Sequence, residues 1–450
     1  MLRTRGVLLG FLLAGGLAGA LVLSEPAFGR RVEGDDWPAF RGPAGNGLSS
    51  EKKAPTAWAP DRNVKWRAAL PMPGNGSPIV SNGRVFLAGT EDSRGMKRVL
   101  YCFDRKDGKQ RWARTVDFKK AIDPDPSKYV HNTNTFSAST PVSDGRKVVV
   151  WHDSAGLFCY DFEGKELWSR DLGDFYHYWG HGASPILLEG KVILNCGPGT
   201  SVFVTALDLE TGKTLWKTDE PQDLDPERVS QGFGDKNRGG KPAGSWATPV
   251  AATVGGKAQV ICAQPTRLVA YDPADGRILW SCDGNRFAKG DLSYSSPMLA
   301  GDVCVMFGGF NGPGVGVRLG GTGDVTQSHR LWRKDDKGNP QSIGTGVFVD
   351  GHLYVPKAGP NVIECVDPKT GEAAWTERWQ GAAFWGSIVQ AGGLLYVTDQ
   401  RGRTAVFRPD PRKFDLVAAN DLGEKTNCTP AISDGEIFIR TQKSLFCIAE

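Results

Sequence analysis

One eleven-residue phrase recurs along the chain and limits its fold more than any other feature. It reads ALDLETGKTLW at 206–216, AYDPADGRILW at 270–280, CVDPKTGEAAW at 365–375 and CFDRKDGKQRW at 102–112, with a shortened copy, CYDFEGKELW, at 159–168. Self-similarity at a spacing of roughly 45–60 residues indicates a propeller or a solenoid before any other architecture. The phrase therefore marks one structural unit that the chain repeats.

Each unit reads as two β-hairpins. The first begins with Ser-Pro or Thr-Pro, continues through aliphatic residues and turns at pairs such as Asn82-Gly83, Asp144-Gly145 and Glu189-Gly190. Such pairs between alternating runs are typical of hairpin turns. The second hairpin is the recurring phrase, whose Asp can accept backbone N–H bonds and whose Gly supplies a positive φ. Four antiparallel strands per unit are the sequence signature of propeller blades.

Counting the strand openers gives the number of blades. The openers are Ser77-Pro78, Thr140-Pro141, Ser184-Pro185, Thr248-Pro249, Ser296-Pro297, Gly344-Thr345, Gly386-Ser387 and Thr429-Pro430. We therefore predict an all-β, eight-bladed β-propeller of four-stranded antiparallel blades.

The two ends of the sequence predict how the ring closes. The eighth unit stops at Glu450 after its third strand, and the segment NVKWRAAL at 63–70 is a Trp strand without a unit of its own. We expect this N-terminal strand to complete the last blade, which would leave no exposed sheet edge between the first and last blades. The predicted organisation is a leader at 1–29, an N-terminal extended arm at 30–62 and the propeller at 63–450.

The tryptophan of the phrase is expected to pack against the next blade. Seven residues occupy this place: Trp66, Trp112, Trp168, Trp216, Trp280, Trp332 and Trp375. The seventh unit has no tryptophan there, and an aliphatic side chain near Leu416 is expected to replace it.

The first 29 residues have the pattern of an export signal. Arg3 and Arg5 precede an uncharged run from Val7 to Leu23, and Ala27 and Gly29 have the spacing that a signal peptidase cleaves. An uncleaved membrane anchor is the alternative. Either reading predicts a periplasmic or secreted protein, with membrane contact only through an uncleaved leader.

The charge argues against nucleic acid as a partner. The chain has 54 Lys and Arg against 50 Asp and Glu, a net charge of +4. This balance is too small for the basic surface that nucleic-acid binding needs.

The nine cysteines do not form an evident disulfide framework. Cys102, Cys159, Cys365 and Cys447 stand at a place that holds Ala206 and Ala270 in other copies. A place that accepts alanine or cysteine is a small apolar site, so we expect buried thiols at these four. The sequence leaves Cys196, Cys262, Cys282, Cys304 and Cys428 undecided.

Segment lengths differ between the two rims of the predicted ring. The first–second and third–fourth connections of every blade share one rim and consist of tight turns. The long segments, at 117–137, 171–182, 219–245 and 309–316, all fall on the other rim. Long loops on a rigid ring are where function concentrates.

Residues just before the openers are the candidate ligand-binding set at the mouth of the central channel. They are His131, Asn132, His177, Trp179, His181, Trp246, Tyr294, Trp385 and Asn427. Rings and amides around a concave mouth suit a small planar ligand or a peptide segment. The alternative is that these side chains only plug the channel.

The sequence predicts neither a metal site nor a catalytic residue. His177 and His181 are four apart, but the segment is interrupted by glycine and lacks the Glu of a zinc-protease motif. No phosphate loop, nucleophile elbow or Cys-x-x-Cys-His haem motif is present.

The recurring pattern Ala/Cys-x-Asp-x-x-Thr/Asp-Gly-x-x-x-Trp resembles the tryptophan docking motif of the PQQ-like (quinoprotein-type) β-propeller repeat family. The resemblance covers nearly everything from 63 to 450, and the stretches DWPAFRGPAGNGLS at 36–49 and GVRLGGTGDVTQSHRLWR at 316–333 resemble secreted bacterial members. It implies an eight-bladed ring, but not one function, because propellers carry many activities.

The resemblance leaves two functions open. The first is a non-catalytic, exported propeller that binds a protein partner or small ligand through its long-loop rim and channel mouth, similar to the propeller subunit of the outer-membrane barrel-assembly machinery. The second is a quinoprotein dehydrogenase, which would hold PQQ with calcium and oxidise alcohols or sugars. We favour the first and predict no cofactor, because the mouth segments offer few of the hard oxygen ligands that calcium needs.

Overall fold

The computed structural model describes residues 36–120, 133–175, 177, 179–198, 202–220, 243–287, 290–335 and 341–450. The expected leader, His131 and Asn132 lie outside these ranges. Within the described ranges, no helix is long and apolar enough to cross a membrane.

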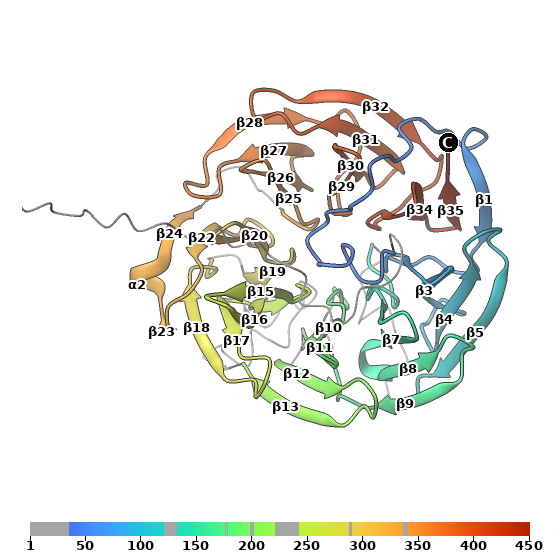
Figure 1. Cartoon of the computed structure of the whole chain (residues 1–450), viewed down its shortest axis with the longest axis horizontal. Coiled ribbons are helices and arrows are strands. Elements are labelled where there is room, and N and C mark those ends of the chain that lie inside the picture. Colours follow the sequence, from blue (N-terminus) through green and yellow to red (C-terminus); the bar gives the residue numbers. More distant parts are fainter. Residues whose placement is uncertain are drawn as a thin grey trace, which may run out of the picture.

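Eight antiparallel sheets surround one axis, as Figure 1 shows, and this confirms the predicted eight-bladed propeller. The first four blades are β2 (Ile79–Ser81), β3 (Arg84–Thr90), β4 (Lys97–Asp104) and β5 (Gln110–Asp117); β6 (Val142–Ser143), β7 (Lys147–Trp151), β8 (Leu157–Asp161) and β9 (Glu166–Arg170); β10 (Ile186–Leu188), β11 (Lys191–Cys196), β12 (Phe203–Asp208) and β13 (Thr214–Asp219); and β15 (Val250–Val254), β16 (Lys257–Ala263), β17 (Arg267–Tyr271) and β18 (Ile278–Asp283). The next three are β20 (Met298–Ala300), β21 (Val303–Phe307), β22 (Gly314–Arg318) and β24 (Arg330–Lys334); β25 (Val347–Val349), β26 (His352–Lys357), β27 (Val362–Val366) and β28 (Ala373–Arg378); and β29 (Val389–Ala391), β30 (Leu394–Thr398), β31 (Arg403–Arg408) and β32 (Asp415–Asp421).

The eighth blade joins the two ends of the chain. It contains β33 (Ala431–Ser433), β34 (Glu436–Arg440), β35 (Ser444–Ile448) and, as its outer strand, β1 (Val64–Ala69). β1 pairs antiparallel with β35, and Trp66 stands opposite Cys447. The prediction that an N-terminal strand closes the ring is therefore confirmed.

The recurring phrase forms the tight turn between the third and fourth strands. In the third blade, Asp208 Oδ1 accepts the backbone N–H of Thr211 at 2.8 Å, and Gly212 has φ +67°. A Cβ on Gly212 would lie 2.5 Å from the ring of Trp168 in the second blade. Glycine is required here because the turn needs a positive φ and because the neighbouring indole lies flat on it.

The phrase tryptophans link each blade to the next. Six of them donate from Nε1 to a backbone carbonyl in the following blade, at 2.8–3.0 Å: Trp66, Trp112, Trp168, Trp216, Trp332 and Trp375. Trp280 differs, because its Nε1 donates to Gln259 Oε1 within its own blade at 3.0 Å.

An insertion explains why Trp280 differs. Residues 319–329, between β22 and β24, carry β23 (Gly323–Asp324) and the one-turn helix α2 (Thr326–His329). β23 pairs with β18 in parallel, Trp280 stands opposite Gly323, and Val325 joins the same buried cluster. This third–fourth connection belongs to the rim of tight turns, so the expectation that every long segment falls on the other rim is wrong here.

The seventh blade has an aliphatic residue near Leu416 at the tryptophan place, as expected. Ala418 stands opposite Val406, at the place that the tryptophans hold elsewhere, whereas Leu416 is 45% exposed. Trp58 of the N-terminal arm is buried in the same cluster as Ala418, and its backbone N–H donates to Asn420 Oδ1 at 3.0 Å. The aliphatic residue at the tryptophan place is therefore Ala418, two positions from Leu416, and Trp58 of the arm belongs to the cluster against which Ala418 packs. Leu416 and Val417 on β32 are exposed.

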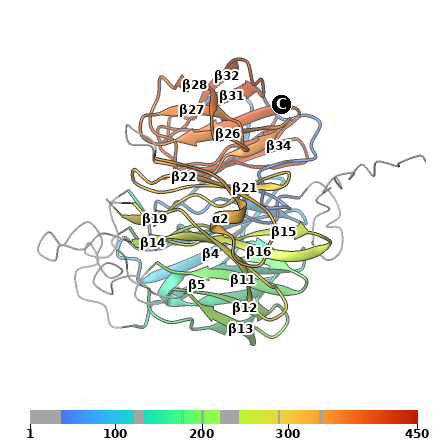
Figure 2. The ribbon, with the colours of Figure 1, turned by 90° about the vertical axis from the view of Figure 1, so that its left-hand side faces the viewer.

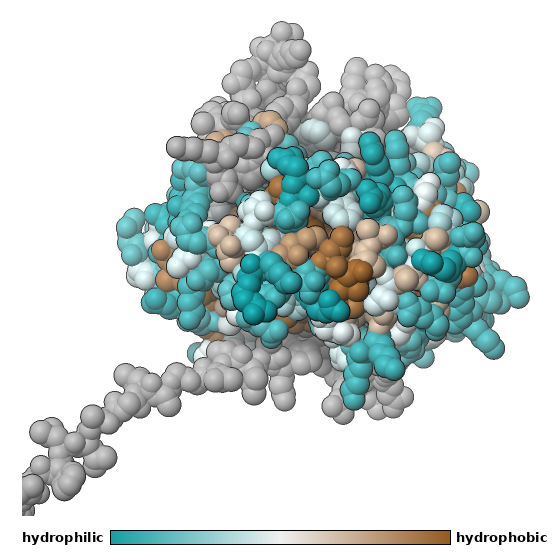
Figure 3. Space-filling view, turned by 90° about the horizontal axis from the view of Figure 1, so that it is seen from above, coloured by the Kyte–Doolittle hydropathy of each residue, from teal (hydrophilic) through white to brown (hydrophobic). Residues whose placement is uncertain are grey.

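Figure 3 shows that the side of the ring seen from above is mainly hydrophilic, with one small apolar area.

The described part of the arm, 36–62, binds several blades. Trp37 and Val80 exchange two backbone hydrogen bonds of 2.9 Å, and Gln390 N donates to Gly47 O at 2.8 Å. Arg41, buried between them, donates to the carbonyl of Gly346 in the sixth blade. Figure 1 shows this blue segment crossing the middle of the ring.

All nine cysteines are free and buried. The four expected thiols, Cys102, Cys159, Cys365 and Cys447, are among them. Burial raises the pKa of Cys102 to about 11, so its thiol stays protonated at neutral pH.

We predict that Trp66→Ala lowers the free energy of unfolding by about 3–5 kcal/mol, because it leaves a cavity and removes the bond to the Arg105 carbonyl at the closure. Denaturant unfolding measures this. The matched change Leu416→Ala, at an exposed site, should cost less than about 0.5 kcal/mol. Equal losses for the two variants would contradict the role of Trp66.

Candidate functional site

A cavity of about 490 Å³ lies on the propeller axis. Phe40 of the arm forms part of its wall, as do the segments that precede the innermost strands. Figure 2 shows one rim from the side, where β14 (Ala243–Ser245) and β19 (Asp291–Ser293) lie; these two short strands pair in parallel. They belong to connections between blades, so they mark the long-loop rim.

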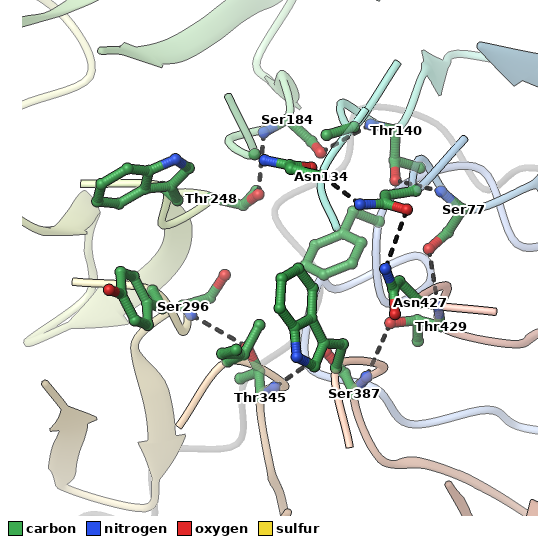
Figure 4. A pocket seen from close by; sticks show the side chains of 18 of the residues that line it. Ser77, Asn134, Thr140, Ser184, Thr248, Ser296, Thr345, Ser387, Asn427 and Thr429 are labelled. Carbon is green, nitrogen blue, oxygen red and sulfur yellow. Dashed lines mark hydrogen bonds between the residues drawn. The ribbon is translucent and has the colours of Figure 1, made fainter. Parts of the chain in front are cut away.

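A ring of hydroxyl groups surrounds this cavity. All eight opener residues line it: Ser77, Thr140, Ser184, Thr248, Ser296, Thr345, Ser387 and Thr429. In seven of the eight steps around the axis, the backbone N–H of one opener donates to the hydroxyl of the next at 2.9–3.0 Å. At the eighth step, from Thr248 to Ser296, the backbone N–H of Thr248 does not donate to the Ser296 hydroxyl. Figure 4 shows this opener ring.

The opener ring satisfies backbone groups that no strand can satisfy. Each opener stands where the innermost strand begins, and its N–H is buried close to the axis. A buried N–H needs a partner, and the hydroxyl of the adjacent blade supplies it. The ring therefore fixes neighbouring blades to each other at the wall of the cavity.

One side of the cavity is built from amides. Gln400 Nε2 donates to Asn427 Oδ1 at 2.9 Å, Asn427 Nδ2 to Asn75 Oδ1 at 3.2 Å, and Asn75 Nδ2 to Asn134 Oδ1 at 2.9 Å. Asn134 Nδ2 in turn donates to the carbonyl of His181 at 3.3 Å. This amide chain runs from the seventh blade through the eighth, first and second blades to the third.

The remaining wall is mainly aromatic. It contains Trp179, Trp246, Tyr294, Phe310 and Trp385. Trp246 meets Tyr294 edge to face, with ring centroids 5.3 Å apart, and its Nε1 donates to the carbonyl of Gly180 at 2.8 Å. Fixed rings opposite fixed amides make a preformed cavity with one apolar and one polar side.

The two described histidines of the candidate set are buried and neutral. His177 lies against Trp246, with ring centroids 4.7 Å apart, and burial lowers its pKa to about 3. Burial also lowers the pKa of His181, although the Asp153 carboxylate, 3.5 Å from His181 Nδ1, acts in the opposite direction. Neither ring carries a charge at neutral pH.

No charged side chain lines the cavity among the described residues. Within the same parts of the chain, no group of three or more His, Cys, Asp or Glu side chains could hold a metal ion. The cavity wall can therefore stack on a ring and exchange neutral hydrogen bonds.

The structure brings six of the nine candidate residues to the cavity wall: Trp179, His181, Trp246, Tyr294, Trp385 and Asn427. His177 lies behind Trp246, and His131 and Asn132 fall outside the described residues. Sequence reasoning missed Phe40, Asn75, Asn134 and Phe310, and it missed the role of the opener hydroxyls. The signal for the hydroxyls was present, since every one of the eight openers includes Ser or Thr.

We predict that stability falls between pH 7.5 and pH 5.5. His152 and His177 have folded-state pKa values lowered to about 3 by burial, against 6.5 for an exposed imidazole. The unfolded chain therefore binds more protons below pH 6.5, and each histidine should remove about 1.4 kcal/mol of stability by pH 5.5. Urea unfolding at the two pH values measures this.

The variant His152→Phe keeps a buried ring that cannot take up a proton. It should lose the share that His152 contributes, about 1.4 kcal/mol between the two pH values, while His177 and His181 keep theirs. An unchanged slope in the variant, or a flat slope in the wild type, would contradict the assignment.

Comparison with known proteins places the fold in a family. A family model described as outer membrane protein assembly factor BamB matches residues 49–117 and 95–377. A search of curated proteins found no match.

Solved structures share the architecture at low identity. The quinohemoprotein alcohol dehydrogenase from Comamonas testosteroni is 15% identical with a TM-score of 0.62, and ADHIIG from Pseudomonas putida HK5 is 14% identical with a TM-score of 0.61. Each alignment covers 92% of this chain and 80% of the other. BamB from Moraxella catarrhalis is 12% identical with a TM-score of 0.56, covering 85% of this chain and 96% of that one.

These structural likenesses establish the fold alone, while the family model spans most of the chain. With its repeated phrase, its eight blades and this match, the chain belongs to the PQQ-like β-propeller family described as outer membrane protein assembly factor BamB.

Proposed function

We propose that this chain is a non-catalytic binding protein whose axial cavity takes a neutral ligand with a flat apolar face. The observation that carries the proposal is an axial cavity of about 490 Å³ whose described lining is aromatic on one side, amide on the other and uncharged throughout. Small-molecule sites are concave, mostly apolar and furnished with a few placed polar groups, and their volumes run from about 300 to 1,000 Å³.

A catalytic reading has little support from the same residues. General acid–base chemistry needs a titratable group within reach of the substrate. The one titratable imidazole of the described lining, His181, is neutral at pH 7 and is held among Trp151 and Phe175, with ring centroids 5.4 and 6.0 Å away. Binding therefore fits this wall better than proton transfer does.

The residues of the described wall do not fit PQQ with calcium. PQQ carries several carboxylates, and calcium takes six to eight oxygen ligands, usually with carboxylates among them. The described lining offers neither an acidic residue nor a lysine or arginine that would balance the charge of the quinone. We accordingly propose a function without this cofactor.

The family match favours one second candidate function, which is the binding of a polypeptide partner. The matching model is named for an outer membrane protein assembly factor, and a partner's aromatic side chain could occupy the same cavity from the long-loop rim. The leader-type sequence at 1–29 supports a site of action outside the cytoplasm for either candidate.

Filling the cavity tests the proposal. Ala138 lines the cavity and is half-buried, so Ala138→Phe should place a ring inside it. We predict that neutral aromatic fragments detected on the wild-type protein by saturation-transfer NMR lose their signal in this variant. The control Leu215→Phe, at a position 47% exposed on β13, should keep every signal.

Two results would contradict this function. Fragments that bind Ala138→Phe as well as the wild type would place binding outside the cavity. A quinone absorption band after addition of PQQ and Ca²⁺, with dye-linked turnover of alcohols or aldoses, would favour the quinoprotein dehydrogenase instead.

A further inference from the structure

Asn75 and Asn427, the two asparagines at the centre of the amide chain, donate both of their side-chain hydrogens to protein groups. Asn75 Nδ2 donates to the carbonyl of Thr133 at 3.2 Å as well as to Asn134. Asn427 Nδ2 donates to the same Thr133 carbonyl at 3.1 Å as well as to Asn75. Each Nδ2 carries two hydrogens, so neither asparagine has an N–H left for a ligand.

The acceptors of the same two side chains are only half used. Asn427 Oδ1 accepts one bond, from Gln400, and Asn75 Oδ1 accepts one bond, from Asn427. An amide oxygen has two lone pairs, so one on each oxygen is not engaged by described residues. Both residues line the cavity and are half-buried. This wall therefore presents hydrogen-bond acceptors and is complementary to a ligand that carries a hydrogen-bond donor.

The opener ring offers the complementary groups. Seven opener hydroxyls each accept a hydrogen bond from a backbone N–H. Their own O–H hydrogens donate to no acceptor among the described residues. A hydroxyl that accepts a bond becomes a better donor, because neighbouring hydrogen bonds polarise one another. The opener ring can therefore donate to an oxygen of the ligand.

We propose that Asn75 and Asn427 make the cavity selective for a planar, neutral lactam, an inference that rests on the proposed function. The ring N–H of such a ligand donates to the amide chain, its adjacent carbonyl accepts from the opener ring, and its flat face lies on the aromatic wall. A carboxylate or an ammonium group suits the site less well, because the described wall has no opposite charge to pair with it.

A pair of isosteric probes tests this proposal on the wild-type protein. 2-Quinolone and coumarin have the same bicyclic shape and the same carbonyl, and they differ only in a ring N–H against a ring oxygen. Sites built to bond an N–H discriminate against an analogue without it, since a buried acceptor is then left unpaired. Calorimetric titration should find 2-quinolone bound about tenfold more tightly than coumarin.

Variants assign the preference to the amide chain. In Asn75→Leu and Asn427→Leu the ratio of the two affinities should fall to about threefold or less, because each removes one acceptor. The control Gln110→Leu, at an exposed position on β5, makes the same kind of change away from the cavity and should keep the full ratio. If the asparagine variants do not fold, the wild-type comparison decides alone.

The outcomes separate this inference from the function on which it rests. Equal affinity for the two probes overturns the donor preference but leaves a cavity that binds neutral planar ligands. Absence of binding by either probe also overturns the lactam, while the fragments tested against Ala138→Phe decide independently whether the cavity binds anything. A ratio that persists in both asparagine variants would assign the preference to other residues.

Discussion

The opener ring is the interaction on which the rest of this structure depends. An innermost propeller strand begins with a backbone N–H that lies close to the axis and has no strand partner. Eight such groups would be costly if they were buried without hydrogen bonds. Here the Ser or Thr hydroxyl of the next blade accepts the N–H at seven of eight steps. The same bonds hold neighbouring blades in register near the axis, and they leave a rigid wall around a cavity rather than a collapsed channel.

Two further devices stabilise the ring away from the axis. At the periphery, the indole of one blade donates to the turn of the next and lies on its glycine, which is why a single phrase carries both Gly and Trp. At the rim of tight turns, the arm binds the first, sixth and seventh blades and places Phe40 in the cavity wall. Phe40 of the arm therefore bounds the cavity on the tight-turn side, and the candidate residues that precede the openers line it from the connections between blades.

The sequence allowed the architecture to be predicted because each blade repeats its own local rules. Turn pairs and opener residues were enough to give eight blades, and the incomplete eighth unit together with the unassigned Trp strand at 63–70 gave their closure. Expectations that depended on contacts between distant segments were less accurate. Trp280 is covered by the insertion at 319–329, and Trp58 of the arm joins the buried cluster between the first, seventh and eighth blades, and no local pattern encodes either arrangement. The cavity residues contributed by loops before the openers were found from position alone, whereas Phe40 and Phe310 come from segments whose approach to the axis only the fold determines.

Amide hydrogen exchange at the openers tests most directly whether the opener ring holds the blades around a preformed cavity. The account predicts slow exchange, approaching the rate of global unfolding, for the amides of Ser77, Thr140, Ser184, Ser296, Thr345, Ser387 and Thr429. It predicts faster exchange for Thr248, whose N–H has no opener hydroxyl as its acceptor. Rapid exchange at all eight openers, or protection of Thr248 equal to that of the other seven, would contradict it.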